Sequence, residues 1–198
     1  MKKFDILITG VGGQGIILAS DIIGEAAIAA GYDVKKTDTL GMAQCGGSVV
    51  SHVRIAEKVF SPLIKKGEVD ILLAFEKLEA ARWAHYLKPG GTAIVNNHAL
   101  PPLSVSLGTD RYPTDEEVLS IIKSRTDRIH LVEGTKQVAA LGNVRTLNMF
   151  MLGCASALLP LKVETWKNEI TLHLPVKIQP INLDAFDLGR KELGNGHR

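Results

Sequence analysis

The chain has 198 residues, of which 45% are hydrophobic, so it is long enough for one domain with a substantial core. Its 23 basic and 21 acidic residues leave a net charge of +2, and no basic stripe with interleaved aromatic residues occurs. This balance argues against a nucleic-acid-binding surface. The two cysteines, Cys45 and Cys154, are far apart and lack a C-x-x-C spacing, which excludes a disulfide framework and an iron–sulfur site.

The membrane and secretory classes are disfavoured as well. The longest apolar run, 149–161, is shorter than the ~20 residues of a membrane span, and it contains Pro160. The basic start of the chain is followed at once by Asp5 and then by glycines, which does not fit a secretory signal. We therefore expect a cytoplasmic protein that does not span a membrane.

The first elements predicted along the chain are a buried strand over 4–9 and a helix over 14–30. The glycine-rich run G-V-G-G-Q-G stands between them at 10–15. Glycines let the backbone approach a ligand closely, and a helix N-terminus offers unpaired N–H groups with a partial positive charge. The run therefore predicts an anion-facing turn, with helix capping alone as the alternative. Its candidate ligand-facing residues are Gly12, Gly13, Gln14 and Gly15.

The same run satisfies the G-x-G-x-x-G pattern of dinucleotide-binding folds through Gly10, Gly12 and Gly15. That fingerprint also needs an acidic residue about 20 positions further on, for the ribose hydroxyls. Lys35 and Lys36 stand there instead. The pattern thus leaves two interpretations open, a nucleotide site and a tight strand–helix turn without a nucleotide. It is not a Walker loop, because no G-K-[ST] follows.

A second candidate region follows a short predicted strand at 32–37. Residues 40–47 predict a loop, and 48–55 alternate like a strand. The small polar residues Gln44, Gly46, Gly47 and Ser48 would let a cofactor or a partner's backbone approach. His52 and Arg54 share one face of the strand, where they suit acid–base and carboxylate-binding roles or, alternatively, pair with neighbouring side chains.

The rest of the chain alternates between strand and helix patterns. Strands are predicted at 69–75, 92–96 and 129–132, with at most one edge strand within 99–111. Helices are predicted at 76–87 (ended by 88–91), 114–124, 134–159 (in two pieces around Gly142), 166–172 and 182–192. This alternation predicts a single domain over 1–198, a three-layer α/β/α fold with a mostly parallel, doubly wound Rossmann-like sheet and extra C-terminal helices. Ligands in such folds bind beyond the strand C-terminal ends.

Asn143, Arg145 and the histidines are the remaining candidates for a site. Asn143 is a candidate ligand-facing residue and helix N-cap, and Arg145 is placed for an anion contact in the same turn. The histidines are scattered without metal-ligand spacing, so no metal site is predicted.

The combination of motifs is more specific than any one of them. G-V-G-G-Q-G-I-I-L-A-S at 10–20 and G-M-A-Q-C-G-G-S-V-V-S-H-V-R-I at 41–55 resemble the gamma domain of 2-oxoacid:ferredoxin oxidoreductases. The segments 142–153 and 182–189 resemble this family too, most closely the small (beta) subunits of its indolepyruvate type. The family pattern usually has arginine where this chain has Cys45, which removes a bidentate anion binder and leaves either a reactive thiol or a plain substitution.

The resemblance implies a component of an oxidoreductase. Such enzymes convert a 2-oxoacid, coenzyme A and oxidised ferredoxin into acyl-CoA, carbon dioxide and reduced ferredoxin, using thiamine diphosphate, Mg²⁺ and [4Fe–4S] clusters. This chain lacks the cysteines for a cluster and a G-D-G motif for thiamine diphosphate. The implied arrangement is therefore a hetero-oligomer, with a homodimer as the alternative for the chain alone. In the hetero-oligomer, a large alpha subunit carries the cofactors, ferredoxin reacts through the complex, and this chain completes the active site.

Two other functions remain open on the sequence. One is a free-standing Rossmann oxidoreductase that binds NAD or NADP. The other is a scaffold module without chemistry, in which the glycine run is only a turn.

Overall fold

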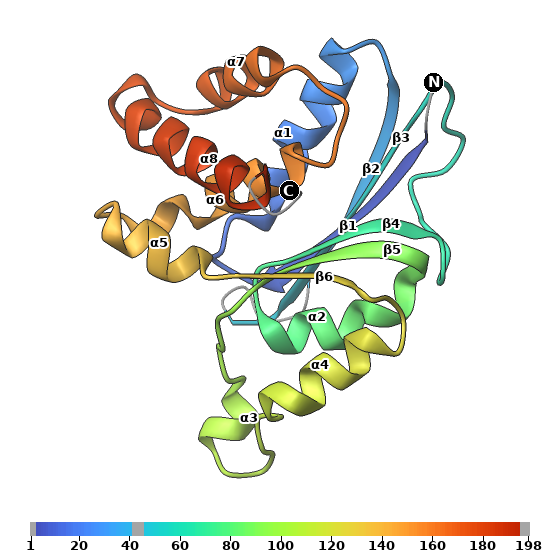
Figure 1. Ribbon diagram of the computed structural model, residues 1–198, viewed down its shortest axis with the longest axis vertical. Helices are drawn as coiled ribbons and strands as arrows, with labels where there is room; N and C mark the ends of the chain where they lie inside the picture. Colours follow the sequence, from blue (N-terminus) through green and yellow to red (C-terminus); the bar gives the residue numbers. More distant parts are fainter. Residues whose placement is uncertain (1–2, 41–45, 195–198) are drawn as a thin grey trace.

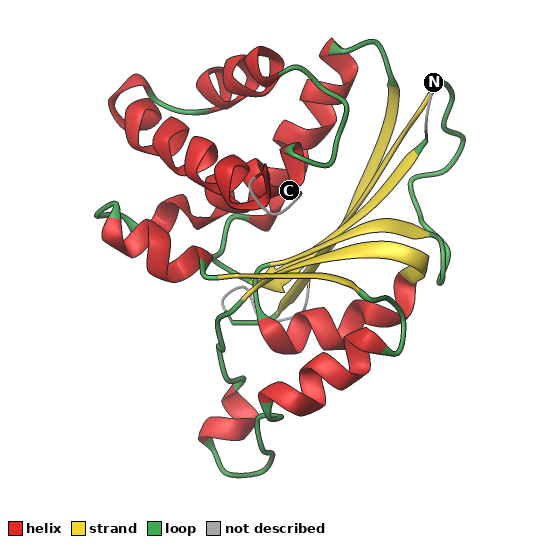
Figure 2. Ribbon diagram, in the orientation of Figure 1, coloured by secondary structure: helices red, strands yellow, loops and turns green. Residues whose placement is uncertain are grey.

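One six-stranded sheet with helices on both faces forms the fold of the computed structural model, which describes residues 3–40 and 46–194 (Figures 1 and 2). The strands are β1 (Phe4–Val11), β2 (Asp33–Leu40), β3 (Ser48–Ala56), β4 (Val69–Ala74), β5 (Leu87–Asn96) and β6 (Arg128–Val132), in the spatial order β2-β3-β1-β4-β5-β6. The α-helices are α1 (Ile16–Ala29), α2 (Lys77–Trp83), α3 (Leu103–Ser106), α4 (Asp115–Lys123), α5 (Gly134–Ala140), α6 (Leu147–Ser156), α7 (Val163–His173) and α8 (Gln179–Gly194). Short 3-10 helices are η1 (Ala84–Tyr86), η2 (Val144–Thr146) and η3 (Val176–Ile178).

The sheet is mostly parallel, as the sequence predicts, and β3 is its antiparallel member. β1, β4, β5 and β6 pair in parallel, whereas β3 pairs antiparallel with both β1 and β2. The start of β3 therefore lies at the C-terminal ends of the parallel strands, with Ser48 opposite Val11. Its far end lies at the opposite edge of the sheet, with Arg54 opposite Asp5.

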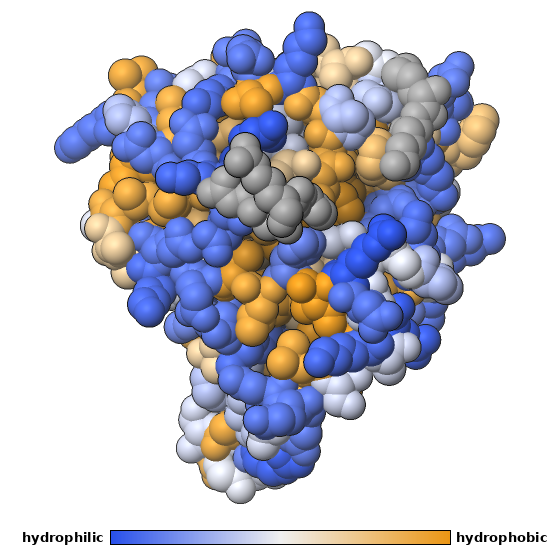
Figure 3. Space-filling view, in the orientation of Figure 1, coloured by the Kyte–Doolittle hydropathy of each residue, from blue (hydrophilic) through white to orange (hydrophobic). Residues whose placement is uncertain are grey.

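The two faces of the sheet carry cores of unequal size. The larger core joins one face to α1, α5, α6, α7 and α8, and the smaller joins the other face to α2 and α4 (Figure 1). The predicted alternation of β3 is confirmed: Val49, Val53 and Ile55 enter the larger core and Val50 enters the smaller one. On the face of the molecule shown in Figure 3, hydrophobic patches are separated from one another by hydrophilic residues.

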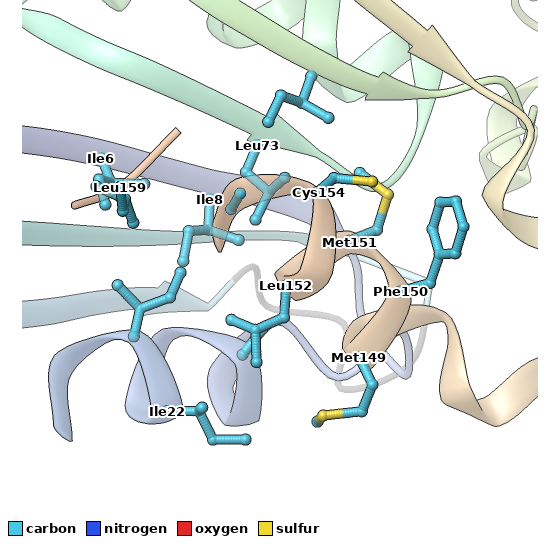
Figure 4. Packing of buried hydrophobic residues seen from close by; sticks show 14 of the residues in the cluster. Ile6, Ile8, Ile22, Leu73, Met149, Phe150, Met151, Leu152, Cys154 and Leu159 are labelled. Carbon is cyan, nitrogen blue, oxygen red and sulfur yellow. The ribbon is translucent and has the colours of Figure 1, made fainter. Parts of the chain in front are cut away.

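Helix α6 is the centre of the larger core, and all its residues are buried (Figure 4). It crosses α8 at backbone contact, because a Cβ on Gly153 would lie 2.0 Å from the carbonyl oxygen of Phe186. Cys154 also belongs to this core, where burial raises the pKa of its thiol above the usual range. The thiol is therefore a small apolar packing group rather than a nucleophile.

Two local expectations differ from the structure. Helix α2 ends at Trp83 rather than near 87, and 88–91 lies inside β5 instead of ending a helix. Segment 99–111, for which at most one edge strand is predicted, holds the short helix α3 and no strand. The predicted capping box of α4 is confirmed, since Thr114 and Glu117 exchange side-chain and backbone hydrogen bonds. Within the described ranges, no helix combines the length and apolar character needed to cross a lipid bilayer.

Candidate functional site

The glycine turn connects β1 to α1 at the C-terminal edge of the sheet, where ligands bind in this class of fold. Gly10 is required by crowding, since a Cβ there would lie 2.6 Å from Gln14 Oε1 and 2.9 Å from Phe75 Cβ. Gly15 is required by its backbone, whose φ of 78° is in the left-handed region, and it caps α1 without a side-chain hydrogen bond. The turn is therefore a tight strand–helix connection of the kind that the sequence predicts.

The side chain of Gln14 holds this turn together from the inside. Its Oε1 accepts a hydrogen bond from Val11 N–H at 2.8 Å, and its Nε2 donates to the Phe75 carbonyl at 3.2 Å. The Gly12 N–H donates to the Gly47 carbonyl at 2.9 Å. The Gln14 side-chain amide and the Gly12 N–H are predicted from the sequence to face an anion. In the structure these two donors bind backbone carbonyls of the segments that adjoin β4 and β3. This arrangement does bring the two sequence motifs into direct contact.

The buried carboxylate of Glu79 is a second link between the motifs, and it is not among the ligand-facing residues predicted from the sequence. It is 4% exposed on α2. Its Oε2 accepts a hydrogen bond from Ser48 Oγ at 2.5 Å, from Trp83 Nε1 at 3.3 Å and from Thr9 Oγ1 at 3.5 Å. Arg82 Nε lies 3.2 Å from Oε1. Glu79 therefore anchors the first residue of β3 beside the glycine turn.

Glu76, three residues earlier, is buried as well, at 1% exposure. It caps α2 by accepting from Glu79 N–H at 2.9 Å, and its other oxygen accepts from Leu100 N–H at 3.0 Å and from the Tyr112 hydroxyl. Burial and this carboxylate raise the pKa of Tyr112 above its usual range, so Tyr112 is a neutral donor. One carboxylate thus holds both ends of the segment that contains α3. The spacing of Glu76, Glu79 and Trp83 on one helix face was visible in the sequence, but not which strand end they meet.

The backbone carbonyl of Phe75, directly after β4, connects the C-terminal end of β5 to the glycine turn. Besides Gln14, it accepts from Asn96 Nδ2 at 3.0 Å. Asn96 is fully buried at the end of β5, and its amide also binds the hydroxyl and the N–H of Thr135 at 2.9 and 3.1 Å. The ends of β1, β4 and β5 are therefore fixed relative to each other by side-chain amides.

His52 and Arg54 share a face of β3 with Ser48 but lie away from the glycine turn. His52 is 4% exposed, and its Nδ1 accepts from Ile64 N–H at 3.3 Å. Burial, and then the charge of Arg54, lower its pKa, so its imidazole is neutral. Arg54 binds Asp5, which is fully buried, at 2.9 Å and two backbone carbonyls. The structure thus places both residues among neighbouring groups, the alternative that the sequence left open.

The remaining predicted residues are placed as follows. Asn143 caps η2 by accepting from Arg145 N–H at 3.0 Å, and Arg145 is exposed. Gly46 is exposed and has φ of 81°. Gln44 and Cys45 lie outside the described residues. In the described part of the chain, no group of three or more His, Cys, Asp or Glu side chains is arranged to hold a metal ion.

A profile of the family described as "Pyruvate ferredoxin/flavodoxin oxidoreductase" matches residues 5–192. The chain is similar to the indolepyruvate oxidoreductase subunit IorB of Pyrococcus horikoshii, with 39% identity over 194 residues that cover 96% of each chain. It is 38% identical to the protein of the same name from Thermococcus kodakarensis, with the same coverage. A 2-oxoglutarate synthase subunit KorC from Methanothermobacter marburgensis is 27% identical over the full length of both chains.

Solved structures share the fold at lower sequence identity. The gamma subunit of keto/oxoacid ferredoxin oxidoreductase from Geobacter sulfurreducens has a TM-score of 0.72 at 24% identity, covering 97% of this chain and 99% of that one. A 2-oxoglutarate:ferredoxin oxidoreductase chain from Magnetococcus marinus has a TM-score of 0.77 at 23% identity, covering 98% of this chain and 32% of that one. The architecture therefore occurs both as a separate chain and as part of a longer one.

Proposed function

The chain belongs to the pyruvate ferredoxin/flavodoxin oxidoreductase family and is a subunit of a 2-oxoacid:ferredoxin oxidoreductase, and we propose that its enzyme oxidises an arylpyruvate such as indolepyruvate. The products would be an acyl-CoA, carbon dioxide and reduced ferredoxin. The observation that carries this choice is the difference in identity between two groups of relatives. The indolepyruvate oxidoreductase subunits IorB are 35–39% identical to this chain, whereas the 2-oxoglutarate synthase subunits KorC are 27–30% identical to it.

The proposed division of labour leaves the redox centres to a large partner subunit, together with thiamine diphosphate and Mg²⁺. A [4Fe–4S] cluster needs four ligands, usually thiolates, and this chain has two cysteines. One of them, Cys154, is buried in the core. The residues of this chain therefore do not fit a cluster. A hetero-oligomer in the cytoplasm, in which ferredoxin and coenzyme A reach the active site through the complex, is the arrangement that we propose.

The part proposed for this chain is to present an ordered polar edge to that partner. Two contacts fix the edge: the Gly12–Gly47 backbone hydrogen bond and the Ser48–Glu79 hydrogen bond. Because the donors and acceptors are buried or half-buried, the edge is arranged before a partner binds. Preorganisation of this kind lowers the entropic cost of assembling an active site from two chains.

The proposal is tested by co-expressing the chain with a large subunit that bears thiamine diphosphate and cluster motifs. The readout is reduction of a viologen dye that depends on both the 2-oxoacid and coenzyme A, compared for indolepyruvate, pyruvate and 2-oxoglutarate. We expect activity only with both chains present and the highest kcat/KM for indolepyruvate. Activity of the single chain would refute the dependence on a partner, and a preference for 2-oxoglutarate would refute the arylpyruvate assignment. Tight binding of NAD or NADP by the single chain would instead favour a free-standing Rossmann enzyme.

A further inference from the structure

The N-terminus of α1 keeps backbone donors that no described residue uses. The N–H groups of Ile16, Ile17 and Leu18 form the first turn, and none donates to another backbone group within the described ranges. Gly15, the cap residue, has no side chain to satisfy them, and the first turn carries no acidic residue. Gly15, Ile17 and Leu18 are half-buried and Gly13 is exposed, so a small ligand reaches this turn from solvent.

Asn148 supplies an independent donor at the same place. It is 6% exposed near the start of α6, and its Oδ1 accepts from Met149 N–H at 3.0 Å. Its Nδ2 lies against the cap of α1, since a Cβ on Gly15 would be 2.6 Å from it. This Nδ2 donates to no described residue. It is also open to solvent, because Trp166 Nε1 is the only described side-chain polar atom that is both sealed and unpaired.

Asn148 Nδ2 and the uncapped N-terminus of α1 thus place several donors side by side, within reach of solvent and without an acceptor among the described residues. We infer that Asn148 Nδ2 and the first-turn N–H groups of α1 form a binding site for a phosphate group. The three successive N–H groups all point out of the N-terminal end of the helix from positions about 100° apart around its axis, and Nδ2 approaches from α6. A tetrahedral phosphate offers oxygens in several directions, whereas a carboxylate offers two oxygens in one plane.

This inference rests on the proposed function only for the identity of the ligand, since the site itself lies wholly within this chain. The proposed anion site also differs in position from the one predicted from the sequence, which lies at residues 12–15. The donors of Gly12 and Gln14 are engaged with Gly47 and Phe75, so the free donors begin at Ile16, two residues after Gln14, and are completed by a helix that is distant in sequence.

The test uses the full chain, labelled with ¹⁵N, and sodium pyrophosphate as the probe. Backbone amides of Ile16 and Ile17 and the side-chain amide of Asn148 are followed by NMR during the titration, at constant ionic strength. We expect saturable shifts at these three groups. Asn148→Asp keeps the acceptor for Met149 N–H and replaces the free donor with a negative charge, so binding should weaken at least about tenfold.

Two further variants keep the test decisive. Asn168→Asp makes the same charge change on the exposed face of α7 and should bind pyrophosphate like the wild type. Asn148→Ala removes the donor without adding charge, and it replaces Asn148→Asp if that variant does not fold. Shifts that are equal in the Asn148 variants and the wild type, shifts that do not saturate, or saturation by acetate in place of pyrophosphate would each overturn the phosphate site. None of these outcomes depends on a partner or on enzyme activity, so failure here is distinct from failure of the proposed function.

Discussion

The two ends of β3 are built from the same ingredients and differ in what they leave unused. Each end has a buried carboxylate bound to a β3 side chain: Glu79 with Ser48 at the glycine turn, and Asp5 with Arg54 at the opposite edge. Ser48 and Arg54 are six positions apart along the strand, a distance of about 20 Å. At the Arg54 end, the guanidinium spans Asp5 and two carbonyls, and Lys3 adds a second cation 2.7 Å from Asp5. At the Ser48 end, free donors remain on the adjoining helix.

This difference indicates that the Asp5–Arg54 pair mainly stabilises the fold, whereas the Glu79–Ser48 pair mainly positions the edge of the sheet. A charge buried among groups that satisfy it mainly stabilises the fold, and its loss is felt as instability. The Ser48–Glu79 contact holds one hydroxyl at the edge where the glycine turn lies, so its loss changes the position of the edge more than the stability of the fold. Arg54 at the far end and His52 midway along the strand both contact groups of this chain, Asp5 and the Ile64 N–H respectively.

The largest expected effect is on stability, from Arg54→Ala. Among the described residues, this variant leaves the fully buried Asp5 with the half-exposed Lys3 as its one countercharge. The free energy of unfolding should fall by about 3–5 kcal/mol, measured by urea denaturation followed by circular dichroism. Lys58→Ala removes an exposed ion pair with Asp33 and should lower the free energy of unfolding far less than Arg54→Ala does. Equal losses in the two variants would contradict the distinction between a buried and a surface pair.

An intermediate effect, on activity, is expected from Ser48→Ala. The variant removes the hydrogen bond to Glu79, which should lower stability by about 1 kcal/mol and lower kcat/KM of the assembled enzyme about tenfold. Ser51→Ala is the matched control, because Ser51 donates to Asp38 from the other face of β3, away from the turn. Its stability loss should be similar and its kcat/KM unchanged. If both variants lose activity alike, the Ser48 end has no special positioning role.

The smallest effect concerns His52, midway along the strand. Its folded pKa lies below the ordinary value of 6.5, so below pH 6.5 the unfolded chain binds a proton that the folded chain refuses. Stability should therefore fall as the pH drops below 6.5, with a contribution of up to about 1.4 kcal/mol per pH unit. In His52→Asn, an amide oxygen takes the place of Nδ1 as acceptor for Ile64 N–H, and this contribution should vanish. An unchanged pH dependence in unfolding experiments would show that His52 is not the responsible group.

Residue patterns were sufficient for the fold class and for the place of the glycine turn. Apolar runs separated by helical periods predict alternating strands and helices, and the alternation of β3 fixed which of its residues share a face. Gly10 and Gly15 follow from local sterics that need no tertiary information. The capping box of α4 is likewise local, because Thr114 and Glu117 bind each other's backbone within one turn.

Only the tertiary structure decided the direction of β3 and the partners of its side chains. An alternating strand reads the same in both directions, so the sequence did not show that Ser48 would meet the glycine turn and that Arg54 would lie at the other edge. The contacts of Glu79 with Ser48 and of Asn148 with Gly15 join residues 31 and 133 positions apart along the chain. Such contacts depend on how the helices pack on the two faces of the sheet, and no local pattern encodes that packing.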